Sequence, residues 1–560
     1  MKATKKLLAL LLAVMMLACT LAACGGSDED VAQPTGNQET EPAAAWDGTP
    51  QYGGHLNTRC SGRPTGLDPM KQTGAWKYQW TTAVYEPFLS RDVDNNICPC
   101  VCDFELSEDQ LDLKVWPREG YTFSRGYGAV EMEDIVASWE RGLNQYSSVK
   151  KYVKPYVKSA QVETIDGKEV FHIQFSEYNE KCLYYFAAYR TWWPVMPREI
   201  CEKYATSYIV GQLEDAVGTG PYIITDFQDS VQVTLTKRDD YIPVDNSQYN
   251  GFAGTKYGYM DSMTFWYNPT DASAALAVLA GDYDTTEVIP SEYESMATDS
   301  GLKLTVLPSD QRTWIYFNTN GTENLVAKYP SLRKAVMAAI DYEAFLDVIT
   351  DSAQILDGDN IMLDPRYDTT DIFKSKDYYG AFDQAVVDKY LDQAKAEGYR
   401  GEPIQLVHHS GRTDIPTMLV EALENAGINH KLSMMERTTY DNFIATPGNN
   451  WDLYFAWGVT ATTPGLLSDS MVENNYNSER VQQIRNQMWS LDPTSDEYMA
   501  LWEEWSELWA EECQLGYMGA IDWWWWHPAT LHINDDGDEG NTARYMFNAF
   551  WEDPQNHPKK

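Results

Sequence analysis

Short β-like runs alternate with helical stretches along most of this chain, and this alternation constrains its fold more than any other feature. From Tyr52 onward, no fixed-period repeat is visible. The runs that read as strands are 170–175, 231–236, 302–307, 314–317, 403–408 and 452–457. The stretches with apolar residues at helical spacing are 130–143, 272–280, 331–348, 384–397, 417–426, 478–488 and 498–512. The alternation predicts a mixed α/β protein.

Three local patterns refine this prediction. In the last helical stretch, tryptophans recur at spacings of three and four, at Trp502, Trp505 and Trp509, which predicts a stripe packed on a core rather than a ligand site. The turn from Gly218 to Tyr222 precedes a strand, so its Gly-x-Gly is structural and not a dinucleotide fingerprint. Ser331 is predicted to cap its helix.

The N-terminal segment has the order of a secretory signal peptide. Three lysines precede an apolar run, and the segment ends in Leu21-Ala22-Ala23-Cys24, which is similar to the lipobox of bacterial lipoproteins. The apolar run is shorter than the roughly 20 residues that a membrane-spanning helix needs. We therefore expect residues 1–23 to be removed and Cys24 to carry a diacylglyceryl anchor on the extracytoplasmic side of the cell membrane. Residues 24–50 are too polar to form a core, which predicts a flexible tether.

Length and charge limit the classes of partner. About 510 residues follow the tether, enough for two or three domains with sizeable cores. The formal net charge of -40 argues against binding to nucleic acid or to an anionic lipid surface, because phosphate binding needs a basic stripe. The chain contains 20 Trp and 36 Tyr residues, which fits a globule that exposes or encloses many rings.

The cysteines predict buried thiols. Of nine, Cys19 leaves with the signal peptide and Cys24 is the lipid site, so seven remain and cannot all pair. Cys98, Cys100 and Cys102 lie two apart and would share one face of a single strand. The second Cys-x-x-Cys pair of a structural zinc site is absent from the sequence, so a metal or redox role is the lesser alternative.

Signatures of catalysis and of metal binding are missing from the sequence. It contains no Gly-x-Ser-x-Gly elbow, Walker loop, His-Glu-x-x-His helix or EF-hand loop. His408 and His409 end a predicted strand, where neighbouring side chains point to opposite faces, so we do not expect them to chelate one metal. The acidic run 534–539 is predicted to form a solvated turn. We expect no enzyme activity, metal or cofactor, although 83 acidic residues leave a glycosidase-like carboxylate pair open.

A series of loose motifs resembles solute-binding protein family 5, the extracytoplasmic peptide and nickel binders of ABC transporters. The segment 217–222, Val-Gly-Thr-Gly-Pro-Tyr, is the most specific match, and Arg238-Asp239-Asp240-Tyr241 follows it. The other matching segments are 52–56, 66–69, 84–89, 102–139, 271–273, 280–284, 317–319, 332–336, 339–341, 427–428, 440, 451–453 and 457. At 125–128 the usual His-Asp-Gly is replaced by Arg-Gly-Tyr-Gly.

The resemblance implies an α/β type-2 periplasmic-binding-protein fold, with two lobes that close about a hinge and an additional subdomain on the first. The implied bounds are 51–85, 200–310 and 515–560 for a discontinuous lobe I, 86–199 for the extra subdomain, and 311–514 for lobe II. Closure of this kind buries a ligand between rigid lobes and changes the surface that a permease meets.

The resemblance also implies where ligand is contacted. Cys60 and Ser61 follow the first strand, and Trp457 and Thr460 lie on the other lobe. Relatives commonly hold a peptide's α-amino group with an aspartate where this chain has Thr460, and a neutral hydroxyl cannot replace that charge-assisted pair. Trp524, within the run 523–526, is the fifth candidate, because a strand would send two of its rings to each face.

We therefore expect a monomeric substrate-binding lipoprotein of an ABC importer, which captures an oligopeptide and delivers it to a membrane permease. An oligosaccharide is the alternative ligand, because rings that stack on sugar faces would explain the tryptophans. An extracellular hydrolase and a purely structural surface protein are the competing classes. Turnover of a captured substrate would support the hydrolase, and absence of ligand-dependent closure would support the structural protein.

Overall fold

The computed structural model describes most of the chain from Trp46 onward. The described ranges are 46–70, 77–92, 96–187, 193–205, 210–319, 323–345, 361–362, 365–411, 413–446, 448–457, 463–465, 467, 478–533 and 545–559, with the backbone alone at 291, 307–311, 365, 438, 457 and 520–524. The predicted signal peptide, Cys24 and the tether up to residue 45 lie outside these ranges, as do 458–462 and the acidic run 534–539. Pro50–Lys560 forms one unit, distinct from Met1–Thr49.

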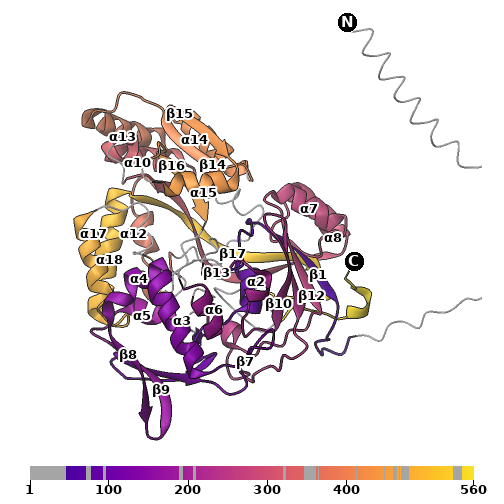
Figure 1. Cartoon of the computed structure of the whole chain (residues 1–560). Helices are drawn as coiled ribbons and strands as arrows, with labels where there is room; N and C mark the ends of the chain where they lie inside the picture. The colour runs from indigo at the N-terminus through magenta and orange to yellow at the C-terminus, as the bar shows by residue number, and fades with distance from the viewer. Residues whose placement is uncertain are drawn as a thin grey trace, which may run out of the picture. The chain divides into compact units, whose positions relative to one another are not determined.

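The first sheet, sheet 1, has the strand order β1-β12-β11-β10. Its strands are β1 (His55–Cys60), β10 (Tyr222–Gln228), β11 (Gln232–Lys237) and β12 (Ser262–Tyr267). β1 and β12 are parallel, and the other neighbours are antiparallel. The helices α2 (Tyr78–Val84), α7 (Asp271–Leu279) and α8 (Ser291–Asp299) accompany this sheet, with α7 and α8 beyond one end of it (Figure 1). The turn predicted at Gly218–Tyr222 leads directly into β10.

Sheet 2 is antiparallel, in the order β4-β5-β9-β8. Its strands are β4 (Cys102–Leu106), β5 (Asp112–Pro117), β8 (Val157–Ile165) and β9 (Lys168–Phe175), and β8 and β9 form a hairpin at the bottom of Figure 1. Short strand pairs and helices surround it: β2 (Leu89–Arg91), β3 (Ile97–Pro99), β6 (Thr122–Phe123), β7 (Gly128–Ala129), α3 (Met132–Gln145), α4 (Ser147–Tyr152), α5 (Glu180–Phe186) and α6 (Arg198–Lys203).

Sheet 3 has the order β15-β14-β16-β13-β17. Its strands are β13 (Leu302–Phe317), β14 (Ile404–His409), β15 (His430–Met435), β16 (Leu453–Trp457) and β17 (Leu515–Pro528). β14 pairs in parallel with β15 and β16, whereas β13 is antiparallel to β16 and β17. The runs 302–307 and 314–317, predicted as two strands, belong to one strand of 16 residues. The polar residues between them interrupted the apolar pattern, and the β13–β17 register shifts there, between Leu307 and Gln311.

Helices cover sheet 3, and one of them differs from its prediction. They are α9 (Leu325–Lys328), α10 (Pro330–Ala339), α12 (Thr370–Lys374), α13 (Gln384–Glu397), α14 (Asp414–Asn425), α15 (Arg437–Ala445), α17 (Glu479–Met488) and α18 (Asp496–Glu512). The helix predicted over 331–348 is broken at Ile340, which is extended, and Asp341 Oδ1 accepts a hydrogen bond from Ala344 N to start a new turn. Ser331 does not cap α10; its hydroxyl donates to Glu397 Oε1 instead.

The remaining elements are short and are spread along the chain. They are β18 (Leu531–His532), β19 (Phe550–Trp551) and the 3₁₀ turns Lys154–Tyr156, Leu213–Asp215, Gly251–Ala253, Pro365–Tyr367 and Pro554–Asn556. Among the described residues, no helix combines the length and the apolar character that crossing a bilayer requires.

The predicted aromatic stripe is confirmed as core. Trp502, Trp505 and Trp509 of α18 are all buried, and Trp509 stacks on Trp314 of β13 with ring centroids 5.2 Å apart. The stripe therefore holds α18 against sheet 3, as the spacing of three and four predicted.

All seven cysteines after the tether are buried, as predicted. The expectation that Cys98, Cys100 and Cys102 share one strand is wrong: Cys98 lies on β3, Cys102 begins β4, and Cys100 lies in the connection. Pro99 has no backbone N–H to donate to a ladder, which accounts for the end of β3. Burial raises the pKa of Cys98 to about 11 and that of Cys100 to about 12, so both thiols stay protonated at neutral pH.

Candidate ligand-binding site

The carboxyl end of β1 meets β17 across one extended segment. Thr285 bridges to Thr58 of β1 in parallel, and Thr286 bridges to Trp526 of β17 in antiparallel orientation. The bridges thus join the edge at which β1 ends to β17, and Cys60 and Trp524 each lie two residues along their strand from a bridged residue. The structure thus brings together two regions that the sequence analysis had singled out separately.

A row of buried polar side chains lies at this edge. Gln79 of α2 donates its Nε2 to Glu287 Oε1 at 2.9 Å, and Thr285 lies two residues before Glu287. Gln79 and Thr285 are 0% exposed and Glu287 is 6% exposed. Gln79 Oε1 and Thr285 Oγ1 have no hydrogen-bond partner within the described part of the chain.

Burying a polar atom without a hydrogen-bond partner costs folding free energy. A polar atom without a partner costs about 1–3 kcal/mol, and native proteins hold few of them. An acceptor on Gln79, a hydroxyl on Thr285 and the carboxylate of Glu287 together fit a bound molecule that carries hydrogen-bond donors. Sequence reasoning missed this row, because its residues lie in no motif; the run Thr285-Thr286-Glu287 between a turn and the apolar pair Val288-Ile289 was the available signal.

The predicted contact residues of β1 differ in their surroundings. Cys60 is 1% exposed, belongs to the hydrophobic core of sheet 1, and donates its thiol to Gly62 O at 3.2 Å. Ser61, the next residue, is half-buried. The Cys60 thiol thus makes its hydrogen bond inside the protein. Ser61 is more accessible to solvent than Cys60.

Trp457 and Trp524 lie on either side of β13. In the strand register, Trp457 of β16 is opposite Thr313 and Trp524 of β17 is opposite Val306. Seven residues of strand span about 23 Å, so the structure does not bring these two positions to one point. The side chains of both tryptophans, and all of Thr460, lie outside the described residues.

The ends of three parallel strands form a second edge. β14, β15 and β16 end at His409, Met435 and Trp457, and ligands of open α/β sheets bind outside such carboxyl ends. The loop that follows β14 comes close to the loop that follows β12, since a Cβ on Gly411 would lie 2.7 Å from Pro269 O. This edge therefore faces sheet 1.

The two histidines at this edge do not point to opposite faces, contrary to the prediction. The rings of His408 and His409 stack with centroids 4.5 Å apart, because the chain turns back after the strand and Gly411 N donates to His409 Nδ1. Tyr440 of α15 lies 5.7 Å from the His409 ring. Within the described residues, no group of three or more His, Cys, Asp or Glu side chains is placed to hold a metal ion. This edge therefore carries packed rings, of which His408 and Tyr440 are buried.

Comparison with known proteins places the chain in a family. The model for "Bacterial extracellular solute-binding proteins, family 5 Middle" matches residues 98–478. The chain belongs to this family. The oligopeptide-binding protein AppA of Bacillus subtilis (strain 168) is 24% identical to this chain over 371 residues, which cover 64% of this chain and 60% of AppA.

Solved structures confirm the predicted type-2 periplasmic-binding-protein fold of this family 5 member. AppA of Bacillus subtilis, solved in complex with a nonapeptide, superposes with a TM-score of 0.72 at 16% identity, over 90% of this chain and 100% of that one. DppA of Helicobacter pylori, solved in complex with the peptide STSA, also gives 0.72 at 16% identity, over 90% and 99% of the two chains. At this identity, the likeness establishes the fold.

Proposed function

We propose that this protein is the substrate-binding lipoprotein of an ABC importer, which captures an oligopeptide between two lobes and delivers it to a membrane permease. The observation that carries the proposal is the row formed by Gln79, Thr285 and Glu287 at the edge where β1 ends, in which Gln79 Oε1 and Thr285 Oγ1 have no hydrogen-bond partner among the described residues. Membership of family 5 and the peptide-binding names of AppA and DppA support it. The protein acts as a binder, without chemistry on its ligand, and as a monomer.

The lobes of this proposal follow the sheets. Lobe I (51–85, 200–310 and 515–560) carries sheet 1, the subdomain (86–199) carries sheet 2, and lobe II (311–514) carries most of sheet 3. β13 and β17 pair over most of their length and join the two lobes, which makes them the hinge. Cys24 anchors the protein through its lipid, and residues 24–50 are the tether. The proposed ligand contacts remain Cys60, Ser61, Trp457, Thr460 and Trp524, and the Cys60 thiol is buried.

The proposal predicts stabilisation by peptides. A protein of residues 50–560 is heated alone, with mixed peptide pools and with oligosaccharide pools. A peptide present at a hundredfold excess over its dissociation constant stabilises the folded state by about 2.7 kcal/mol, which raises Tm. A shift with glycans alone would replace the peptide by an oligosaccharide, and release of products from either pool would overturn the non-enzymatic reading.

The buried row predicts which substitution weakens binding. Glu287→Gln keeps the size of the side chain but removes the charge that would accept a donor of the ligand. Hydrogen bonds to charged groups contribute about 1.5–3 kcal/mol, so we expect the Kd of the peptide found by heating to rise by roughly 10- to 100-fold in isothermal titration calorimetry. Glu292→Gln on α8 is the control, because Glu292 is exposed on the surface. An unchanged Kd for Glu287→Gln would remove this row from the site.

A further inference from the structure

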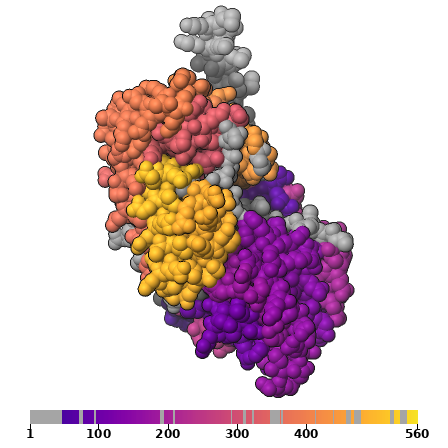
Figure 2. All heavy atoms as spheres, turned by 90° about the vertical axis from the view of Figure 1, so that its left-hand side faces the viewer, coloured from indigo at the N-terminus to yellow at the C-terminus, as the bar shows by residue number. Residues whose placement is uncertain are grey.

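The first turn of α5 in the subdomain contacts two segments of lobe II. The backbone N–H of Glu180 donates to Trp489 O at 3.2 Å, and its carboxylate Oε1 accepts from the hydroxyl of Thr463. Trp489 in turn donates its Nε1 to Gly465 O at 3.3 Å. Figure 2 shows the surface around α17 and α18, in orange and yellow, directly against the purple subdomain. These contacts connect the subdomain to lobe II at a place separate from β13 and β17.

Lys181, the next residue, contacts aromatic rings on both sides of the same junction. Its side chain is buried, and its Nζ lies 3.6 Å from the ring centroid of Tyr152 in the subdomain and 4.3 Å from that of Trp489 in lobe II. The two rings meet edge to face with centroids 5.9 Å apart. The Lys181 side chain thus packs against one ring from each side of the junction.

The junction is closely fitted around Gly465. Its N–H donates to the hydroxyl of Tyr498 at 2.7 Å. A Cβ at this position would lie 2.8 Å from Glu180 Oε2 and 3.0 Å from that hydroxyl. Glu180 Oε2 is itself buried and has no hydrogen-bond partner within the described residues. Only a residue without a side chain fits against the carboxyl group of Glu180.

We propose that the first turn of α5 is a latch, in which Glu180 and Lys181 dock the subdomain onto Thr463, Gly465 and Trp489 of lobe II. Because the subdomain is joined along the chain to lobe I, any motion about β13 and β17 must make or break this contact. The latch thus adds a second connection between the moving parts. Its role in closure rests on the proposed function, whereas the docking contact itself does not.

Both ionisable groups of the latch, Glu180 and Lys181, have pKa values close to neutral pH. Burial raises the pKa of Glu180 to about 7, against the opposing effects of the Thr463 hydrogen bond and of the Arg91 and Lys181 charges. Burial lowers the pKa of Lys181 to about 6, and the Arg485 and Lys151 charges act in the same direction while Glu180 opposes them. Tyr178 and Tyr498 also face Glu180, and burial raises the pKa of both phenols, so they stay neutral.

The two groups have opposite effects on the pH dependence of docking. The docked state holds its proton on Glu180 up to about pH 7, whereas an exposed glutamate loses it near 4.5, so the Glu180 contribution favours docking at low pH and fades as pH rises to 7. The docked state has lost the Lys181 proton above about pH 6, whereas an exposed lysine keeps it up to 10.5, so the Lys181 contribution grows above 6. Between pH 6 and 7 the two slopes cancel, which keeps docking insensitive to pH there.

Single variants separate the two slopes. The protein is spin-labelled at exposed positions on either side, Lys150→Cys in α4 and Asn486→Cys in α17, and the docked fraction is measured by double electron–electron resonance from pH 5 to 9. With Glu180→Gln, docking should strengthen by up to about tenfold per pH unit above pH 6; with Lys181→Met, it should weaken by a similar factor per unit from pH 5 to 7. Wild type should change less than twofold between pH 6 and 7.

Controls distinguish the latch from a general effect of charge. Glu177→Gln removes an exposed carboxylate three residues before Glu180 and should leave the wild-type profile unchanged. Gly465→Ala should lower the docked fraction at every pH, and adding Glu180→Ala should restore part of it, because the clash with Oε2 is removed. Profiles of both single variants that match wild type would overturn the proposal. These measurements need no ligand, so they fail or succeed independently of peptide binding.

Discussion

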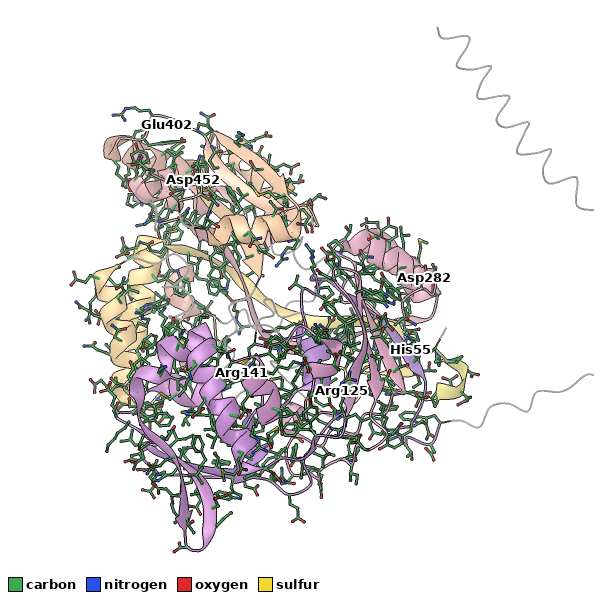
Figure 3. The ribbon with its side chains drawn as sticks, viewed as in Figure 1. His55, Arg125, Arg141, Asp282, Glu402 and Asp452 are labelled. Carbon is green, nitrogen blue, oxygen red and sulfur yellow. The ribbon has the colours of Figure 1, made fainter. Side chains whose placement is uncertain are left out.

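Arg141→Met is expected to lower the free energy of unfolding by about 3–5 kcal/mol, measured as a loss of midpoint in urea, because it leaves a buried carboxylate without its cation. Arg141 of α3 (Figure 3) donates its Nη2 to Asp68 Oδ2, and the two side chains are 3% and 0% exposed. Asp68 also accepts hydrogen bonds from Met70 N and Val210 N. The pair connects α3 to the segment that follows β1.

Two further variants test this explanation. The double variant Asp68→Asn/Arg141→Met removes both charges, so it should recover part of the loss. Arg480→Met breaks the ion pair with Glu504 on the surface, where the side chains are 42% and 43% exposed, and should cost less than about 1 kcal/mol. Equal losses at the buried and exposed pairs would show that burial of charge is not the cause.

The motifs that carried the family resemblance turn out to serve the scaffold. Glu86 accepts hydrogen bonds from Thr219 Oγ1 at 2.8 Å and from Lys256 Nζ at 2.6 Å, which joins the matching segments 84–89 and 217–222 to Lys256. Asp452 (Figure 3) accepts hydrogen bonds from Leu325 N and Gln405 N, and so fixes the start of α9 to the start of β14. Such residues predict a fold well, because their partners are backbone groups whose positions the fold itself determines.

The candidate site was harder to predict for the same reason. Gln79, Thr285 and Glu287 come from α2 and from a segment between β1 and β17, and only the bridge pairings bring them together. Side chains that face a ligand have no periodic or capping pattern along the chain, and fold sets the scaffold rather than the specificity. The break of the predicted helix at Ile340 is a milder case, where the apolar spacing continued and the Asp341 turn was overlooked.

Gly218→Ala should cost about 3 kcal/mol of folding free energy, at the upper end for overpacking of a core. A Cβ at this position would lie 2.0 Å from the carbonyl oxygen of Val84 and 3.0 Å from the Tyr85 ring. Val84 O already accepts the hydrogen bond of Gly220 N, so the backbone cannot withdraw without losing that bond and shifting Thr219 away from Glu86.

Gly167→Ala, in the β8–β9 turn, provides the matched comparison for Gly218→Ala. Gly167 has a φ of +82° and open space around its Cβ, so alanine there meets backbone strain without a clash and should cost about 1 kcal/mol. Thermal and urea denaturation of both variants, at one pH and without peptide, measure the difference. If Gly218→Ala were no worse than Gly167→Ala, the close approach of this turn to α2 would not be what the Gly-Thr-Gly-Pro-Tyr segment preserves. A larger loss of stability for Gly218→Ala than for Gly167→Ala would show that the segment packs α2 against the start of β10. This packing sets the position of Gln79 in the candidate site.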